Sequence, residues 1–283
     1  VNIFLALSNS SNYIPAKQWL SDQTDYVNSQ AYILPIAGPN YIPILNSDFP
    51  RPQVSARSAV IYDTKSSRFL YDKNSGTKLP IASLTKVLSS VIVLENLNLD
   101  DIVTISEGSI MVDKEKQDLY LGEKLTVRNL LKLMLIESSN DAAYALADHA
   151  DKSGFNFVEA MNEKSVSVGM MDSFFADPAG LNDSGYSTAQ DLVKLVVYSL
   201  DYPEIWDISS EKTTIVESSD ERIKHKITST NRLLGLIKDI IGGKTGYTDI
   251  AGQCMILVAN VPDYPSKIVS IVLGSVNRFG DSH

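Results

Sequence analysis

The sequence contains little of what metal and disulfide chemistry require. Cys254 is the only cysteine among 283 residues, so no disulfide can form within the chain and no zinc site can be built on thiolates. The three histidines, His149, His225 and His283, do not have the spacing of a metalloprotease helix. So few histidines also disfavour a Ser-His-Asp triad. We therefore expect no metal and no other cofactor.

Long apolar runs and an excess of positive charge are also missing. No stretch reaches the roughly 18–20 consecutive apolar residues of a membrane span. The formal net charge is −9, whereas a nucleic-acid partner would require a basic face. The apolar fraction of 44% is ordinary for a folded protein. The composition indicates a globular protein that does not bind nucleic acid.

The order of the predicted elements indicates the fold class. Residues 1–56 are rich in proline and polar residues and read as an extended leader or linker before a domain at 57–283. Strand patterns occur at both ends of the domain, at 58–63 and 68–71 and again from residue 226 onward. Helical spacing fills the middle, with Thr126 as an expected N-cap. We predict an α/β (α+β) protein with an antiparallel sheet flanked by helices. Its sheet lobe is expected at about 57–100 and 226–283, and an inserted helical lobe at about 101–225.

A serine and a lysine lie one helical turn apart at the start of the first predicted helix. Ser83 could simply be its N-cap, as many such serines are. Lys86 lies on the same face, and burial in this apolar helix would lower the pKa of its ammonium. The neutral amine could then take the proton of the Ser83 hydroxyl, and the helix N-terminus could offer the Ser83 backbone N–H to an oxyanion. Alone, this S-x-x-K pattern is weak.

Ser138 and Asn140 occur between two predicted helices. They could be no more than turn residues that bond to the local backbone. In a functional interpretation, Ser138 relays a proton to the leaving group and Asn140 binds the substrate backbone. The sequence of this segment alone leaves both alternatives open.

A third short pattern, Lys244-Thr245-Gly246, falls on a predicted strand. It is not a phosphate-binding loop, because Lys238 occupies the position that needs glycine. A glycine here would let a ligand backbone approach the strand, Lys244 would add positive potential, and Thr245 would bind a carboxylate. The backbone N–H of Tyr247 could be the second oxyanion donor. The alternative is an ordinary glycine-containing strand with an exposed lysine.

The three patterns occur on a helix start, between helices and on a strand, in that order. This joint arrangement is typical of serine acyl-transfer enzymes in which a lysine is the base. From about residue 57 to 281 the sequence also resembles the serine D-alanyl-D-alanine carboxypeptidases, the low-molecular-mass penicillin-binding proteins of peptidase family S11. The resemblance is carried by the segments 80–86, 135–143, 180–192 and 243–252.

The resemblance implies a fold, a reaction and a partner. The fold would be the penicillin-recognising serine transpeptidase/β-lactamase-like fold. Ser83, activated by Lys86, would attack the bond between the terminal D-alanines of a peptidoglycan stem peptide. The backbone N–H groups of Ser83 and Tyr247 would hold the oxyanion, and Ser138 and Lys244 would protonate the leaving D-alanine. Water would then hydrolyse the acyl-enzyme, and β-lactam antibiotics would acylate Ser83 as covalent inhibitors.

The resemblance also predicts where the protein acts. Thr245 and Gly246 would contact the substrate, with Arg278 as a further candidate for its terminal carboxylate. The expected location is extracytoplasmic, in the cell envelope, either secreted or tethered to the outer face of the cytoplasmic membrane through a terminus. The sequence departs from the family in its leader and in stopping soon after Arg278.

Two alternatives on the same fold remain. A class A-like β-lactamase needs a glutamate to activate the deacylating water, but residues 177–182 read DPAGLN and contain none. A non-catalytic cell-wall-binding scaffold would not need all three patterns intact. Both alternatives are therefore less favoured than the carboxypeptidase.

Overall fold

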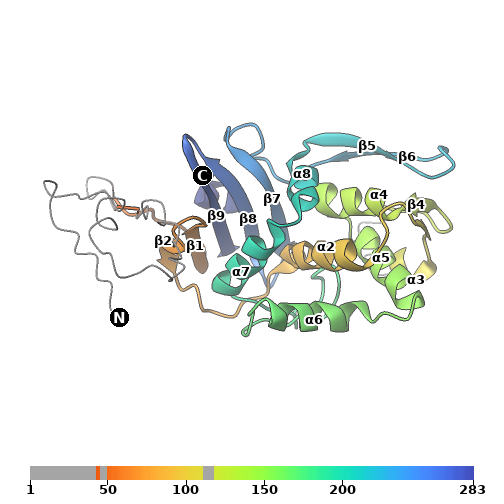
Figure 1. Ribbon diagram of the computed structural model, residues 1–283, viewed down its shortest axis with the longest axis horizontal. Helices are drawn as coiled ribbons and strands as arrows, with labels where there is room; N and C mark the ends of the chain where they lie inside the picture. Colours follow the sequence, from red (N-terminus) through yellow and green to blue (C-terminus); the bar gives the residue numbers. More distant parts are fainter. Residues whose placement is uncertain (1–42, 45–49, 111–117) are drawn as a thin grey trace, which may run out of the picture. The chain divides into compact units, whose positions relative to one another are not determined.

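The computed structural model describes residues 43–44, 50–110 and 118–283, all of which fall within one unit of the chain, Tyr41–His283. Most of the predicted leader lies outside the described residues, and its role stays a prediction. The frame is a five-stranded antiparallel sheet in the order β2-β1-β9-β8-β7 (Figure 1). Its strands are β1 (Ser58–Asp63), β2 (Arg68–Lys73), β7 (Ile240–Thr248), β8 (Gly252–Val261) and β9 (Tyr264–Ser275).

Both ends of the domain contribute to this one sheet, as the sequence predicts. β1 pairs antiparallel with β9, so that Ala59 lies opposite Val272 although the two residues are far apart in the chain. β8 and β7 continue the sheet on the other side of β9. β7 is consequently an edge strand, with one row of backbone groups not used by the sheet.

Helices fill the middle of the chain, and one more short helix follows the last strand. They are η1 (Ala82–Leu84), α2 (Thr85–Asn96), α3 (Glu107–Ile110), α4 (Val127–Lys132), the π-helix η2 (Leu133–Glu137), α5 (Asn140–Lys152), α6 (Phe157–Ser167), α7 (Ala189–Ser199), α8 (Pro203–Ser210) and α9 (Arg278–Ser282). Thr126 is the N-cap of α4, as predicted, and accepts a hydrogen bond from the Asn129 N–H. The helix α2 is buried on all sides from Thr85 to Val93 and contacts α5, α6, α7 and α8, as its mostly apolar sequence favours.

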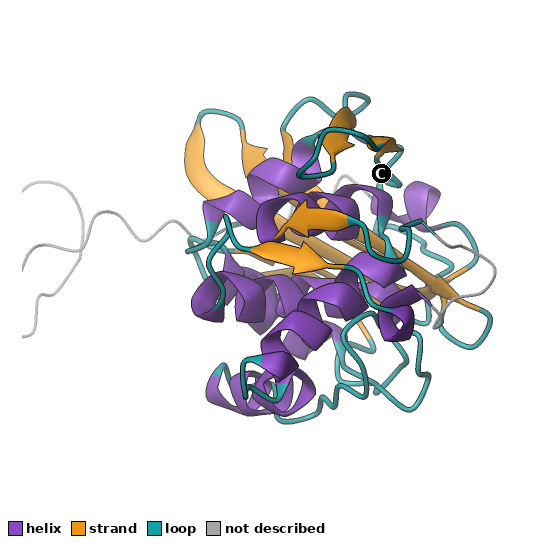
Figure 2. Cartoon of the chain, turned by 90° about the vertical axis from the view of Figure 1, so that its right-hand side faces the viewer, coloured by secondary structure: helices purple, strands orange, loops and turns teal. Residues whose placement is uncertain are grey.

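The alternation of side chains along β8 explains how both faces of the sheet are covered. Ile256 and Val258 point into the main core, on the face where α7 packs against β1 and β9. Helices packed against the strands of the sheet are visible in Figure 2. Met255 and Leu257 point to the opposite face, where they form a second cluster with Phe279 of α9. The short helix α9 therefore covers the sheet face that the central helices leave open.

Two small two-stranded antiparallel sheets lie within the part of the chain predicted as helical. They consist of β3 (Ile102–Thr104) with β4 (Lys124–Thr126), and β5 (Thr213–Glu217) with β6 (Lys224–Thr228). The prediction that strands resume only at residue 226 was therefore wrong. The alternation of apolar and polar residues that predicts a strand is weak in β5. Val216 is its only buried residue, so β5 lacks the regular alternation of a half-buried sheet.

Candidate active site

The nucleophile predicted from the sequence lies at a strained turn before α2. Ser83 is the middle residue of η1, and its neighbour Ala82 has a φ of +49°, a left-handed conformation that is rare for alanine. The N-cap position of α2 is taken by Leu84, and no side chain caps that helix. The alternative in which Ser83 only caps the helix is therefore wrong. The half-buried side chain of Ser83 is directed to a lysine instead.

Lys86 is fully buried, and three oxygen atoms surround its Nζ. The nitrogen lies 2.9 Å from Ser83 Oγ, 2.7 Å from Asn140 Oδ1 and 2.9 Å from the carbonyl oxygen of Ala179. The amide and carbonyl oxygens can only accept hydrogen bonds. The two hydrogens of a neutral amine satisfy these two acceptors, and its lone pair then faces the Ser83 hydroxyl. This geometry is what proton abstraction from Ser83 requires.

The second pattern divides its side chains between local and long-range contacts. Ser139 makes the local bond, since it caps α5 and accepts from the Ala142 N–H. Ser138 has a left-handed backbone, with a φ of +67°, and its Oγ accepts a hydrogen bond of 2.7 Å from Lys244 Nζ. Asn140, the first residue of α5, contacts Lys86. The turn-only interpretation of Ser138 and Asn140 is therefore wrong.

The edge strand β7 lies directly against the nucleophile turn. A Cβ atom on Gly246 would be 2.9 Å from the carbonyl oxygen of Ile81 and 3.0 Å from the backbone nitrogen of Ser83, which leaves room only for glycine. Lys244 is buried rather than exposed, contrary to the alternative of an ordinary strand, and its Nζ also donates to the Thr245 carbonyl. Nucleophile turn, second pattern and β7 thus meet in one place.

The predicted carboxylate-binding residues are grouped at the same strand. Thr245 is buried, and its Oγ1 lies 2.6 Å from Thr230 Oγ1. Arg278 does not contact the Thr245 side chain; its Nη1 donates to the carbonyl oxygen of Gly246 at 2.7 Å. Burial lowers the pKa of Arg278 from its usual value, but a guanidinium in proteins keeps its charge. Its positive charge therefore lies beside the strand.

Tyr247, at the end of this strand, is half exposed. Its phenol donates to Asp249 Oδ1 at 2.9 Å, and this hydrogen bond raises the pKa of Tyr247. Its side chain thus has a partner of its own, and its predicted contribution depends on the backbone N–H alone. That role stays a prediction.

The sequence that forms this site matches one family of known proteins. The sequence pattern of the D-alanyl-D-alanine carboxypeptidases, peptidase family S11, matches residues 46–277. The chain belongs to this family. D-alanyl-D-alanine carboxypeptidase DacF of Bacillus subtilis is 31% identical over 226 residues, which are 78% of this chain and 57% of that relative. A D-alanyl-D-alanine endopeptidase of Escherichia coli is 30% identical over 239 residues, covering 82% of this chain and 76% of the relative.

Solved structures agree with the family and the fold. Penicillin-binding protein D2 of Listeria monocytogenes, in a cefotaxime-bound form, is 32% identical, with a TM-score of 0.73 over 82% of this chain and 96% of that one. The protein thus has the predicted fold, an antiparallel sheet with flanking helices.

Two contributors to the site were missed by the sequence analysis. The carbonyl oxygen of Ala179 has no side-chain signature, so only the backbone path of the loop reveals it. Thr230 sits in a connection between β6 and β7 whose sequence carries no periodic pattern. Within the described ranges, no helix is both long and apolar enough to span a membrane, and no cluster of His, Cys, Asp and Glu suits a metal ion.

Proposed function

We propose that this S11 family member is a serine D-alanyl-D-alanine carboxypeptidase that removes the terminal D-alanine from peptidoglycan stem peptides. The observation that carries the proposal is the position of Lys86 Nζ, which contacts Ser83 Oγ and Asn140 Oδ1 at the same time. A serine next to a buried amine is the arrangement that nucleophilic acyl transfer needs.

In the proposed acylation, Lys86 takes the proton of Ser83, whose Oγ forms a bond to the carbonyl carbon of the penultimate D-alanine. The close approach of Gly246 to the Ser83 nitrogen supports an oxyanion site between the backbone N–H groups of Ser83 and Tyr247. The peptide C–N bond then breaks. Lys244 passes a proton through Ser138 to the amine of the departing D-alanine, along the 2.7 Å contact between these two side chains.

The substrate would lie along the free edge of β7, and its terminal carboxylate would be held by Thr245 and the positive charge of Arg278. Water then cleaves the ester on Ser83 and regenerates the hydroxyl. β-Lactam antibiotics would acylate the same atom, in keeping with the cefotaxime-bound form of the Listeria protein. The substrate places the reaction outside the cytoplasm, with the enzyme secreted or tethered to the membrane.

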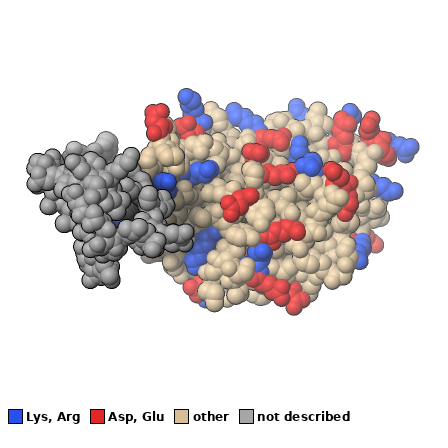
Figure 3. Space-filling view, in the orientation of Figure 1, with Lys and Arg blue, Asp and Glu red and all other residues tan. Residues whose placement is uncertain are grey.

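The surface fits a peptide substrate better than a nucleic acid. Acidic and basic side chains are interspersed over the face shown in Figure 3, and the net charge is −9. A polyanion would need a continuous basic surface.

The test is release of free D-alanine from diacetyl-Lys-D-Ala-D-Ala. We expect release by the unmodified protein and none by Ser83→Ala. Ser210→Ala should keep full activity, because this half-buried serine at the end of α8 donates its hydroxyl to the Asp207 carbonyl, within the same helix. Equal release by the unmodified protein and Ser83→Ala would refute the assignment. Mass spectrometry after penicillin treatment should find the adduct on Ser83 and no adduct in the variant.

A second candidate is endopeptidase action on cross-linked stem peptides, since relatives named D-alanyl-D-alanine endopeptidases are about as similar as the carboxypeptidases. The same residues would carry out this reaction. Incubation with a D-alanyl cross-linked muropeptide dimer separates the two: conversion of the dimer to monomers faster than D-alanine release from the pentapeptide would favour the endopeptidase.

A further inference from the structure

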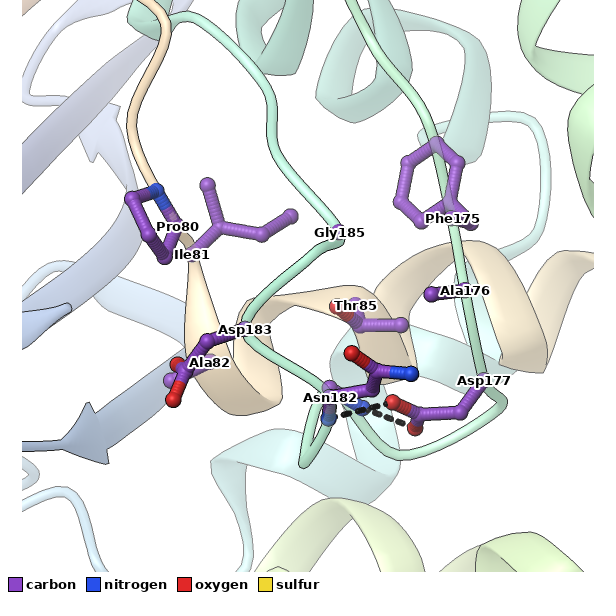
Figure 4. Close-up of a pocket in the computed structure, with 11 residues that line it drawn as sticks. Pro80, Ile81, Ala82, Thr85, Phe175, Ala176, Asp177, Asn182, Asp183 and Gly185 are labelled. Atoms are coloured by element: carbon purple, nitrogen blue, oxygen red, sulfur yellow. Dashed lines mark hydrogen bonds between the residues drawn. The ribbon is translucent and has the colours of Figure 1, made fainter. Parts of the chain in front are cut away.

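A buried aspartate organises the loop that follows α6 and passes behind the nucleophile turn. The carboxylate of Asp177 is 6% exposed and accepts hydrogen bonds from four consecutive backbone N–H groups. Oδ1 accepts from Ala179 and Gly180, both at 2.6 Å, and from Leu181 at 3.3 Å, while Oδ2 accepts from Asn182 at 2.7 Å. Figure 4 shows the carboxylate directed across the bend of the loop toward Asn182. Bonds of this kind are strong because the acceptor is charged.

This loop is attached to the helix that carries the base. The carbonyl oxygen of Pro178 accepts a hydrogen bond of 2.6 Å from Ser89, and that of Ala179 accepts one of 2.9 Å from Lys86. Both donors lie on α2, three residues apart and thus on the same side of the helix. The backbone N–H groups of the loop turn toward Asp177 while its carbonyl groups turn toward α2. The carboxylate therefore sets the direction of the carbonyl that contacts Lys86.

The loop also has little freedom to move away from this position. Gly180 has a φ of +76°, and a Cβ atom there would fall 2.0 Å from the carbonyl oxygen of Ala82 and 2.6 Å from Thr85 Oγ1. Between loop and turn remains a cavity of only about 10 Å³, whose lining includes Ala82 and Thr85 from the side of the turn and Asp177 and Gly180 from the loop (Figure 4). This is about the space of one water molecule.

We propose that Asp177 is a positioning residue for acylation: by ordering the loop, it holds the Ala179 carbonyl against Lys86 Nζ and so directs the remaining lone pair of the amine at Ser83 Oγ. The inference rests on the proposed function. With the Ala179 acceptor fixed, one amine hydrogen is fixed, and Asn140 Oδ1 fixes the second. Without the Ala179 acceptor the amine can rotate, and the lone pair points at Ser83 only part of the time.

The charge of Asp177 acts in the same region. It reaches α5, where burial and then the Asp177 charge raise the pKa of Tyr144, one helical turn from Asn140. Loss of the carboxylate should therefore disturb the surroundings of the base and reduce the rate at which it acts.

The experiment compares Asp177→Ala and Asp177→Asn, using the second-order rate of acylation by a fluorescent penicillin at neutral pH. Asparagine can still accept the three N–H groups at Oδ1 and so keeps most of the loop geometry. We expect Asp177→Ala to acylate about 10- to 100-fold more slowly than the unmodified protein at neutral pH, since small misplacements of a base have effects of this size. Asp177→Asn should stay within a few-fold of the unmodified rate.

Asp191→Asn is the matched control for lost stability. Asp191 is as buried as Asp177 and anchors a different segment, accepting from the Asp172 N–H, Ser173 Oγ and Lys194 Nζ. Its variant should lower Tm but leave the acylation rate of the folded protein unchanged. The proposal is overturned if Asp177→Ala keeps the unmodified rate, or if Asp177→Asn, which keeps the Oδ1 acceptor, is as slow as Asp177→Ala. Absence of acylation in the unmodified protein would instead refute the proposed function.

Discussion

The sharpest stability test concerns Gly180, where the loop touches the nucleophile turn. In Gly180→Ala the new Cβ meets the Ala82 carbonyl oxygen at 2.0 Å, its carbon at 2.5 Å and Thr85 Oγ1 at 2.6 Å. An alanine in a left-handed conformation costs about 1–2 kcal/mol, and overpacking adds about 1–3 kcal/mol. We expect the free energy of unfolding to fall by about 2–5 kcal/mol and Tm by roughly 4–20 °C.

Because two of the three clashing atoms belong to Ala82, relief of the clash must displace the residue next to Ser83. We therefore expect acylation by a fluorescent penicillin to slow by about 100-fold in the folded variant, the size of effect that a shift of about 1 Å produces. The measurement is made well below the lowered Tm, so that slower acylation does not reflect unfolding.

Gly154→Ala separates backbone strain from the clash. Gly154 has a similar φ of +84°, but a Cβ there meets no atom within 4 Å, and the residue is exposed beyond the end of α5. This variant should lose only about 1–2 kcal/mol, for the left-handed backbone, and acylate normally. Equal Tm values for the two variants, together with unchanged acylation by Gly180→Ala, would show that the loop does not press on the nucleophile turn.

Two further predictions concern the strand and the helical core. Thr230→Val removes the partner of Thr245 Oγ1, so KM for the D-alanyl peptide should rise about fivefold with little change in kcat, in steady-state D-alanine release; a fall in kcat alone would contradict this. Burial tends to raise the pKa of Glu95, but hydrogen bonds from Lys164 and two tyrosines outweigh it, and the net pKa is lowered from 4.5. The stabilisation is therefore present above about pH 4.5 and lost as pH falls through the folded pKa. Urea unfolding should give Glu95→Gln a lower free energy of unfolding than the unmodified protein at neutral pH, and this difference should shrink in acid. A difference that stays constant with pH would contradict the prediction.

The elements predicted correctly from the sequence are those with strong periodic or chemical signals. The mostly apolar run after Ser83 predicts a buried helix, and α2 is buried on every side from Thr85 to Val93. Thr126 precedes an apolar helical pattern and caps α4 through its own hydroxyl. The sequence also predicted that the three short patterns meet at one site. They fall on a helix start, between two helices and on a strand, which is the joint arrangement typical of serine acyl-transfer enzymes. The structure brings Ser83, Lys86 and Asn140 together, and Ser138 with Lys244.

What could not be predicted depends on backbone paths and short elements. The β5–β6 hairpin has too few buried side chains to produce a period, and α8 is only eight residues long. The carbonyl of Ala179 contacts Lys86 because the loop turns over Asp177, and an aspartate followed by proline predicts only a turn. A sequence can suggest that a loop exists, but not which way its carbonyl groups face.

The two buried lysines of the site illustrate why these carbonyl directions matter for function. Lys86 contacts two oxygens that can only accept, and its third contact is the hydroxyl that must lose a proton. Lys244 donates to one such oxygen, the Thr245 carbonyl, and also contacts a hydroxyl, Ser138 Oγ, that can both accept and donate. The first arrangement suits a base for Ser83, since an amine can satisfy both acceptors and still accept. The second suits a proton donor, since its hydroxyl can pass a proton onward. The two roles thus depend on the acceptors around each nitrogen, although both residues are lysines.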